Sequence, residues 1–263
     1  MALAKVSLGK GTGQFVGPYH ARSWPVNRAP RPVPMLDLNA YCDNFVAVVR
    51  RLDEAAVKRM ANLVYAAWRG RHAVFICGNG GNFANAAHFA ADLVKLTAPP
   101  VGPRLRAVAL GESLSGLTAV SNDIAYDQVF AEQLRAFLSP NDLVIGLSTS
   151  GSSPNVLRAV EYANESGAVT FGITGLGGRK LQAAARYPLV VASASVQQIE
   201  DATMLVGHMV CLLVRDMVLA SADTRRAVAH EIHAAAEPEM RAGRSEMPGV
   251  PRPDPEERPP AVA

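Results

Sequence analysis

Short apolar runs alternate with helical patterns through the middle of the chain. The runs are often β-branched and are bounded by turn residues, as buried parallel strands are. They occupy residues 73–76, 107–110, 143–147, 169–173 and 189–192, and helical patterns occupy residues 82–96, 125–137 and 155–166 between them. Such alternation is typical of a doubly wound α/β fold. We therefore predict a five-stranded parallel sheet flanked by helices.

Two longer helical patterns, at residues 36–68 and 196–219, have no strand of their own. Both carry apolar stripes at helical spacing. The stripes consist of Val46, Val49, Leu52, Val57, Met60 and Val64 in the first pattern, and Met204, His208, Cys211 and Val214 in the second. We expect these helices to pack on each other or on another subunit.

Composition and charge divide the chain into three parts. A chain of 263 residues with 49% hydrophobic residues can bury one large core. Residues 1–34 form a basic, Pro-containing arm, residues 35–222 the folded domain, and residues 223–263 a short helix followed by a disordered Pro- and charge-rich tail. Outside the two tails the net charge is zero, so the chain lacks the dense basic face of a nucleic-acid-binding protein.

Membrane segments and disulfides are not expected. No uninterrupted apolar run reaches the roughly 18 residues that span a bilayer, and the N-terminal stretch lacks the apolar core of a signal peptide. Cys42, Cys77 and Cys211 are odd in number and widely spaced. These features predict a cytoplasmic protein without a disulfide framework.

A hydroxyl-rich loop follows the predicted strand at residues 143–147. The sequence LVIGLSTSGSSPN delivers five hydroxyl side chains to the start of a helix: Ser148, Thr149, Ser150, Ser152 and Ser153. Unpaired N–H groups at a helix start and neutral hydroxyls together suit a phosphate group. The alternative is an ordinary capped loop, which would need one hydroxyl rather than five. We name this segment, residues 148–153, the hydroxyl loop.

A glycine-rich loop, CGNGGN at residues 77–82, follows the first predicted strand. Glycines there let the backbone approach a ligand at the carboxyl edge of the sheet. The spacing is not the G-x-G-x-x-G of dinucleotide-binding proteins, and no acidic residue follows the second strand, so NAD binding is not expected. Cys77 is interpreted as a small buried hydrophobic residue rather than a nucleophile.

Four potential metal ligands occur in two pairs. His88 and Asp92 are four residues apart on one predicted helix, and Glu200 and His208 are eight apart on another, about two turns and about 80° of rotation. Two imidazoles and two carboxylates could complete a tetrahedral zinc shell or bind another divalent metal. Either pair could instead consist of exposed polar side chains that bind no metal. Both histidines, however, lie in apolar strings, where an unpaired imidazole is costly to bury.

Six motifs together resemble the phosphoheptose isomerase branch of the sugar isomerase (SIS) domain family. They are CGNGG, HFAADL, SND at residues 121–123, STSGSSPN, GITGLGGRKL and QQIEDATMLVGH, and the resemblance covers residues 36–218. It implies a homotetramer with active sites between subunits. It also implies interconversion of sedoheptulose 7-phosphate and D-glycero-D-manno-heptose 7-phosphate, in the biosynthesis of nucleotide-activated heptoses.

The resemblance also implies roles for individual residues. Asp92 would be the base and His208 its partner in proton transfer, and His88, Asp92, Glu200 and His208 would bind one zinc per subunit. The substrate would contact Asn79, Gly80, Gly81, Asn82, Asn122, Asp123, Ser148, Thr149, Ser150, Ser153 and Glu200. Three positions depart from the best-known members, which carry Glu at position 92, Gln at 200 and Ser at 82.

Two other functions remain open from the sequence. One is a phosphosugar-binding or partner-binding protein without catalysis, like the replication-initiation regulators of this branch, which would lack the acid–base residues that are present here. The other is a kinase, hydrolase or transferase acting on an amino sugar phosphate, which would need an attached domain or an N-terminal nucleophile. An isomerase is favoured over both.

Overall fold

The computed structural model describes residues 36–99 and 103–244, and it contains a five-stranded parallel sheet in the order β2-β1-β3-β4-β5. The strands are β1 (Ala73–Gly78), β2 (Arg106–Ala109), β3 (Leu143–Leu147), β4 (Val169–Gly175) and β5 (Tyr187–Val191). Each overlaps one of the predicted apolar runs, and β1, β3 and most of β4 are buried, as strands covered on both faces must be. The predicted fold class is confirmed.

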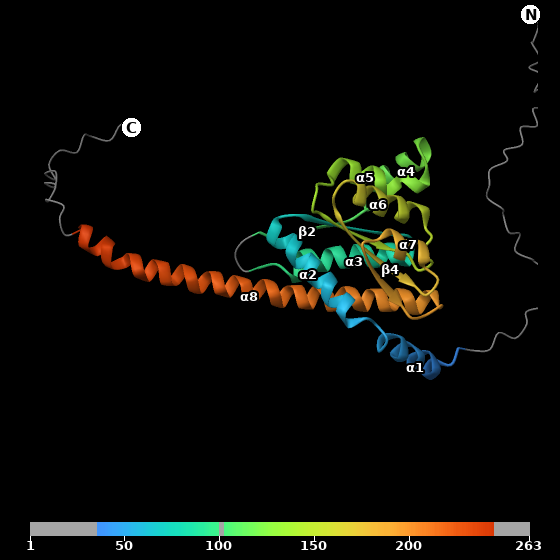
Figure 1. Ribbon diagram of the computed structural model, residues 1–263, viewed down its shortest axis with the longest axis horizontal. Helices are drawn as coiled ribbons and strands as arrows, with labels where there is room; N and C mark the ends of the chain where they lie inside the picture. Colours follow the sequence, from blue (N-terminus) through green and yellow to red (C-terminus); the bar gives the residue numbers. More distant parts are fainter. Residues whose placement is uncertain (1–35, 100–102, 245–263) are drawn as a thin grey trace, which may run out of the picture.

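Helices cover both faces of the sheet (Figure 1). They are α1 (Leu38–Val49), α2 (Glu54–Gly70), α3 (Gly81–Leu96), α4 (Leu114–Asp123), the short η1 (Tyr126–Gln128), α5 (Val129–Phe137), α6 (Pro154–Glu165), α7 (Arg179–Ala184) and α8 (Val196–Arg244). Helices α2, α3 and α8 pack in one hydrophobic core with one face of the sheet, and α5, α6 and α7 pack in a second core with the other. The sheet is thus the middle layer of three.

The prediction of one helix over residues 36–68 is wrong, because two helices, α1 and α2, occupy this range with a break between them. The Asp53 side chain accepts hydrogen bonds from the backbone N–H groups of Ala55 and Ala56, at 2.9 and 3.2 Å. This N-cap satisfies backbone donors that a helix start leaves free, and so it begins a new helix within the apolar pattern. The exposed helix α1 is tied to the start of α8 by a 2.8 Å hydrogen bond from the Tyr41 hydroxyl to Asp201.

Helix α8 packs along α2 and α3 and then extends beyond the sheet (Figure 1). It runs to Arg244, past the boundary predicted at residue 222, while the predicted N-terminal arm (residues 1–34) and residues 245–263 of the predicted tail lie outside the described residues. The packing predicted between the two long helical patterns is present, since Met60 and Val64 of α2 share a buried cluster with Val206 of α8.

Part of α8, Val196–Ser221, is long and apolar enough to cross a membrane by length and composition. This window is not an uninterrupted apolar run, since it contains polar residues such as His208, and it is apolar only on average. Within this window Ala202, Val206 and Val210 are fully buried in the protein core. The core helix of a folded domain passes the same test, so the window is weak evidence for a membrane span.

Strands β2 and β3 lie on opposite sides of β1, so the sheet is extended first to one side of β1 and then to the other. The helix after β1 covers one face and the helix after β3 covers the other, so the two loops diverge at the carboxyl edge. Open α/β sheets bind ligands in the crevice at such a point. These loops are the glycine-rich loop and the hydroxyl loop.

Candidate active site

A cavity of about 460 Å³ lies at this carboxyl edge. Its wall includes Asn79 and Asn82 from the glycine-rich loop and four residues of the hydroxyl loop: Ser148, Thr149, Ser150 and Ser153. The remaining wall comes from the end of β3, the end of β4 with the loop after it, the segment before α8 and the first turns of α8: Leu147, Gly175, Leu176, Gly177, Ser193, Ala194, Val196, Ile199 and Glu200. Glu200 is the one ionisable side chain of this wall.

The two loops are joined by side-chain amides. Asn79 and Asn155 form a reciprocal amide pair, with N···O distances of 2.8 and 2.9 Å. Asn82, where the family resemblance implies Ser, donates from Nδ2 to the Thr149 hydroxyl at 2.9 Å. Because Asn82 and Asn155 are both buried, these bonds are shielded from competing water.

Hydroxyl groups in the hydroxyl loop pair with one another. The Ser148 and Ser153 oxygens are 2.9 Å apart, and the Ser152 hydroxyl donates to Ser150 at 3.0 Å. Ser153 is the N-cap residue of α6 but makes no capping hydrogen bond with its side chain. Its hydroxyl is therefore not used to cap α6. Ser153 lines the cavity, and the start of α6 favours an anion there.

Gly151 allows the hydroxyl loop to pack against the loop after β4. Its φ is +61°, and a Cβ placed on it would lie 2.3 Å from the Cα of Gly178. A side chain is therefore excluded both by the backbone conformation and by the neighbouring backbone.

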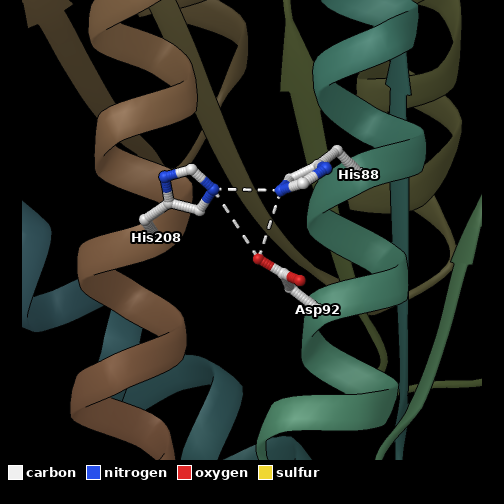
Figure 2. Close-up of side chains that lie close together, drawn as sticks. All are labelled: His88, Asp92 and His208. Carbon is white, nitrogen blue, oxygen red and sulfur yellow. Dashed lines mark hydrogen bonds and ion pairs between the residues drawn. The ribbon is translucent and has the colours of Figure 1, made fainter.

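His88, Asp92 and His208 converge between α3 and α8 (Figure 2). The Nε2 atoms of the two histidines are 2.9 Å apart, and Asp92 Oδ2 is 3.3 Å from His88 Nε2 and 3.7 Å from His208 Nε2. Ligand atoms about 2.0–2.2 Å from one zinc ion stand roughly 3–3.6 Å apart, so this spacing fits a single ion. Two imidazoles and one carboxylate are suitable ligands for zinc and for other divalent transition metals.

Glu200 is not brought into this group of three, although it was predicted as its fourth member. It precedes His208 by eight residues, which is about 12 Å along a helix. Its carboxylate instead lies at the start of α3, where a Cβ on Gly81 would come within 2.3 Å of Oε2. Glycine at position 81 thus leaves room for Glu200 beside the cavity.

Some predicted substrate contacts lie elsewhere. Asn122 and Asp123, at the end of α4, are exposed, bond to each other at 2.8 Å and do not line the cavity. Gly80 and Gly81 shape the turn into α3, and Gly80 has a φ of +56°, but neither lines the cavity.

The sequence analysis missed the segment before α8. Ser193 and Ala194 follow β5, so the rule that ligands bind beyond the carboxyl ends of the strands could have found them. It also missed Asn155 and Tyr126, which bond to Asn79 but do not line the cavity themselves.

The cysteines do not supply a nucleophile to this site. Burial raises the pKa of the fully buried Cys77 thiol to about 12, in agreement with its interpretation as a small hydrophobic residue. Burial, with a smaller contribution from the Asp92 charge, also raises the pKa of Cys211 to about 12. Both thiols are therefore neutral and unreactive near neutral pH.

Known proteins share this sequence and fold. The family model for the SIS domain matches residues 40–175, which is over half of the chain. The phosphoheptose isomerase of Rhodospirillum rubrum is 38% identical over 186 residues, covering 68% of this chain and 96% of the relative. That of Solidesulfovibrio magneticus is 42% identical over 166 residues, covering 62% of this chain and 77% of the relative.

Solved structures agree with the sequence comparison. A phosphoheptose isomerase from Neisseria gonorrhoeae superposes with a TM-score of 0.63 at 30% identity, covering 68% of this chain and 96% of that one. A phosphoheptose isomerase from Francisella tularensis gives the same TM-score at 27% identity, with the same coverage. The chain therefore belongs to the SIS domain family, in its phosphoheptose isomerase branch.

Proposed function

We propose that the protein is an aldose–ketose isomerase that converts sedoheptulose 7-phosphate to D-glycero-D-manno-heptose 7-phosphate. One observation carries the proposal: a hydroxyl-lined cavity adjoins the same two helices, α3 and α8, that bring His88, Asp92 and His208 together. A phosphate-binding end and a group capable of proton transfer are what the reaction needs. The relatives named phosphoheptose isomerase carry the same fold.

The hydroxyl loop suits the phosphate of the substrate. Ser148, Ser150 and Ser153 offer hydroxyls to the cavity, and the start of α6 adds a favourable dipole. Neutral donors bind a phosphate less tightly than a cluster of cations would, so the product can leave. The C7 phosphate at this end would direct the sugar chain toward Asn79 and Glu200.

Isomerisation moves a proton between C1 and C2. A base takes a proton from C1 of the ketose while an acid protonates the C2 oxygen, which gives an enediol. Return of a proton to C2 and loss of the proton on O1 then give the aldehyde. The site therefore needs a base near both carbons, an acid near both oxygens and a group that stabilises negative charge on oxygen.

We assign the base role to Asp92 and the partner role in proton transfer to His208. Their side chains are in contact, with 3.7 Å between Asp92 Oδ2 and His208 Nε2. Glu200 adds a second carboxylate in the cavity wall itself. There Glu200 would contact the substrate, while Asp92 would take the proton.

His88, Asp92 and His208 would hold one zinc ion per chain, without Glu200, whose carboxylate lies beside Gly81. A bound divalent ion would supply stabilisation of negative charge on the substrate oxygens. Both histidines would bind it through Nε2 in the neutral form. The ligand atoms of His88, Asp92 and His208 lie within 4.8 Å of one another, which supports this assignment.

We further propose a cytoplasmic homotetramer with sites between subunits. Exposed apolar side chains on α1 and α8 support assembly, since Leu38 is 70% and Leu212 45% exposed. A phosphorylated sugar does not cross membranes unaided, which supports a cytoplasmic enzyme. We propose neither a nucleic-acid partner nor a membrane partner.

Incubation of the purified chain with sedoheptulose 7-phosphate, followed by detection of the aldose, tests the function. The parent should form the aldose, and a double variant with Ser148→Ala and Ser150→Ala should show a KM higher by roughly one to three orders of magnitude. Binding of the sugar phosphate without turnover would favour the non-catalytic alternative, which the kinship with phosphoheptose isomerases does not favour.

A further inference from the structure

Asn79 makes three side-chain hydrogen bonds, more than any other side chain of the cavity wall in the described residues. Its Oδ1 accepts from Asn155 Nδ2 at 2.9 Å and from the Tyr126 hydroxyl at 3.0 Å, and its Nδ2 donates to Asn155 Oδ1 at 2.8 Å. Three of the four hydrogen-bonding positions of the amide are therefore used. The fourth, the second N–H of Nδ2, has no partner in the described part of the chain, and Asn79 lines the cavity.

The direction of the Asn79 amide is fixed by the backbone. Asn155 Oδ1 also accepts from the Val156 backbone N–H at 3.0 Å, and a backbone N–H can only donate. The Asn155 oxygen must therefore remain on that side. If Asn79 alone turned over, its oxygen would face that oxygen and its nitrogen would face the Asn155 nitrogen, so both bonds of the pair would be lost.

Tyr126 strengthens this arrangement as a second donor to Asn79 Oδ1. It begins η1, after α4, and its side chain is half exposed, while Asn155 is 1% exposed at the start of α6. The two partners of Asn79 thus come from separate elements. A second donor on Oδ1 disfavours rotation of the amide, because rotation would break that bond as well.

We infer that Tyr126 and Asn155 are positioning residues that keep Asn79 a hydrogen-bond donor to the substrate. This inference rests on the proposed function. A fixed N–H selects an acceptor, such as the carbonyl oxygen of the sugar or the oxygen anion of the enediol. Preorganised donors of this kind stabilise negative charge on oxygen without reorganising during the reaction.

A double-mutant cycle on kcat/KM tests the positioning role. Tyr126→Phe removes the hydroxyl and keeps the ring, and we expect it to lower kcat/KM for sedoheptulose 7-phosphate about three- to tenfold, the effect of one lost hydrogen bond. In an Asn79→Ala background the same change should have no effect, since nothing remains to be positioned. An equal loss in both backgrounds would overturn the inference, and so would no loss in the parent background.

Two controls separate positioning from general damage. Tyr162→Phe removes a hydroxyl about two turns further along α6 than Asn155, where the ring lies under Arg135, and it should leave kcat/KM unchanged. The affinity for inorganic phosphate should be unchanged in Tyr126→Phe, because the hydroxyl loop is intact. Asn155→Asp, which puts an acceptor opposite Asn79 Oδ1, should lower kcat/KM further than Tyr126→Phe; if it fails to fold, the Tyr126 cycle still decides.

A measurement without turnover separates this inference from the proposed function. In the parent, nuclear magnetic resonance should show one Asn79 side-chain N–H proton exchanging slowly with water and the other rapidly, and Tyr126→Phe should speed the slow one. That result supports positioning even if sedoheptulose 7-phosphate is not converted, an outcome that would overturn only the proposed function. Equal and rapid exchange of both protons in the parent would overturn the positioning role.

Discussion

Replacing Gly151 with alanine should disturb the phosphate end of the cavity through backbone overlap. The added Cβ would lie 2.3 Å from Gly178 Cα and 2.6 Å from its carbonyl oxygen. These are backbone atoms in the loop between β4 and α7, so they cannot turn away as a flexible side chain could. The hydroxyl loop and the loop after β4 must therefore separate.

Gly167→Ala is a matched control for this variant. Gly167 has a φ of +76°, close to the +61° of Gly151, but its nearest neighbour would be Pro140 Cβ at 3.8 Å, which is ordinary contact. It follows α6 at the end opposite the cavity, about 18 Å from the start of that 12-residue helix. Both variants place an alanine in the left-handed backbone conformation, which lowers stability. Only Gly151→Ala adds steric overlap with a neighbouring backbone.

The expected magnitudes follow from these two terms. A left-handed alanine costs about 1–2 kcal/mol, so Gly167→Ala should lower Tm by about 2–8 °C. Overlap in a packed region adds about 1–3 kcal/mol, so Gly151→Ala should lower Tm by about 4–20 °C. Displacement of the hydroxyls by about 1 Å should also weaken catalysis by up to about a hundredfold.

Thermal unfolding and phosphate titration together decide the outcome. Calorimetric titration with inorganic phosphate should show weaker binding to Gly151→Ala and unchanged binding to Gly167→Ala. Equal losses of Tm in the two variants, with phosphate affinity intact in both, would refute the idea that Gly151 sets the contact between the two loops.

Three further outcomes are expected. Chelation should remove one zinc per chain by elemental analysis, lower Tm and abolish turnover, with zinc restoring all three; full activity without metal would refute the metal site. Asp92→Asn should reduce both metal content and kcat, whereas Glu200→Gln should mainly change kcat/KM; equal metal loss in both would make Glu200 a ligand. Met60→Glu should unfold the chain, because Met60 is fully buried, whereas Val46→Glu on exposed α1 should only shift the assembly seen by light scattering.

The Met60 prediction depends on what covers the apolar stripe through Val57, Met60 and Val64. From the sequence, either the other long helix of the same chain or another subunit could cover this stripe. In the structure α8 of the same chain covers that stripe. Helical periodicity reveals that a face is buried, but it does not reveal whether the covering helix belongs to the same chain.

Secondary structure was predictable where residues are buried. The central strands β1, β3 and β4 could be predicted because both faces of the sheet are covered there, which leaves apolar runs in the sequence. Helix α4 (Leu114–Asp123) was missed; none of its residues is buried, and only the partly buried Leu117 and Val120 pack against the second core. The break before α2 depends on one side chain, Asp53, inside an otherwise continuous apolar pattern.

The candidate site shows the same limit at the level of single side chains. Spacing along α3 placed His88 and Asp92 on one face, but it could not determine which turn of α8 lies opposite. In the structure His208 faces His88, and Glu200, two turns earlier, faces Gly81. Helices α3 and α8 run in the same direction here, so Gly81 and Glu200 meet at one level. His88 and His208 meet about two turns further along both helices. Glu200 therefore belongs to the cavity wall and not to the group of His88, Asp92 and His208.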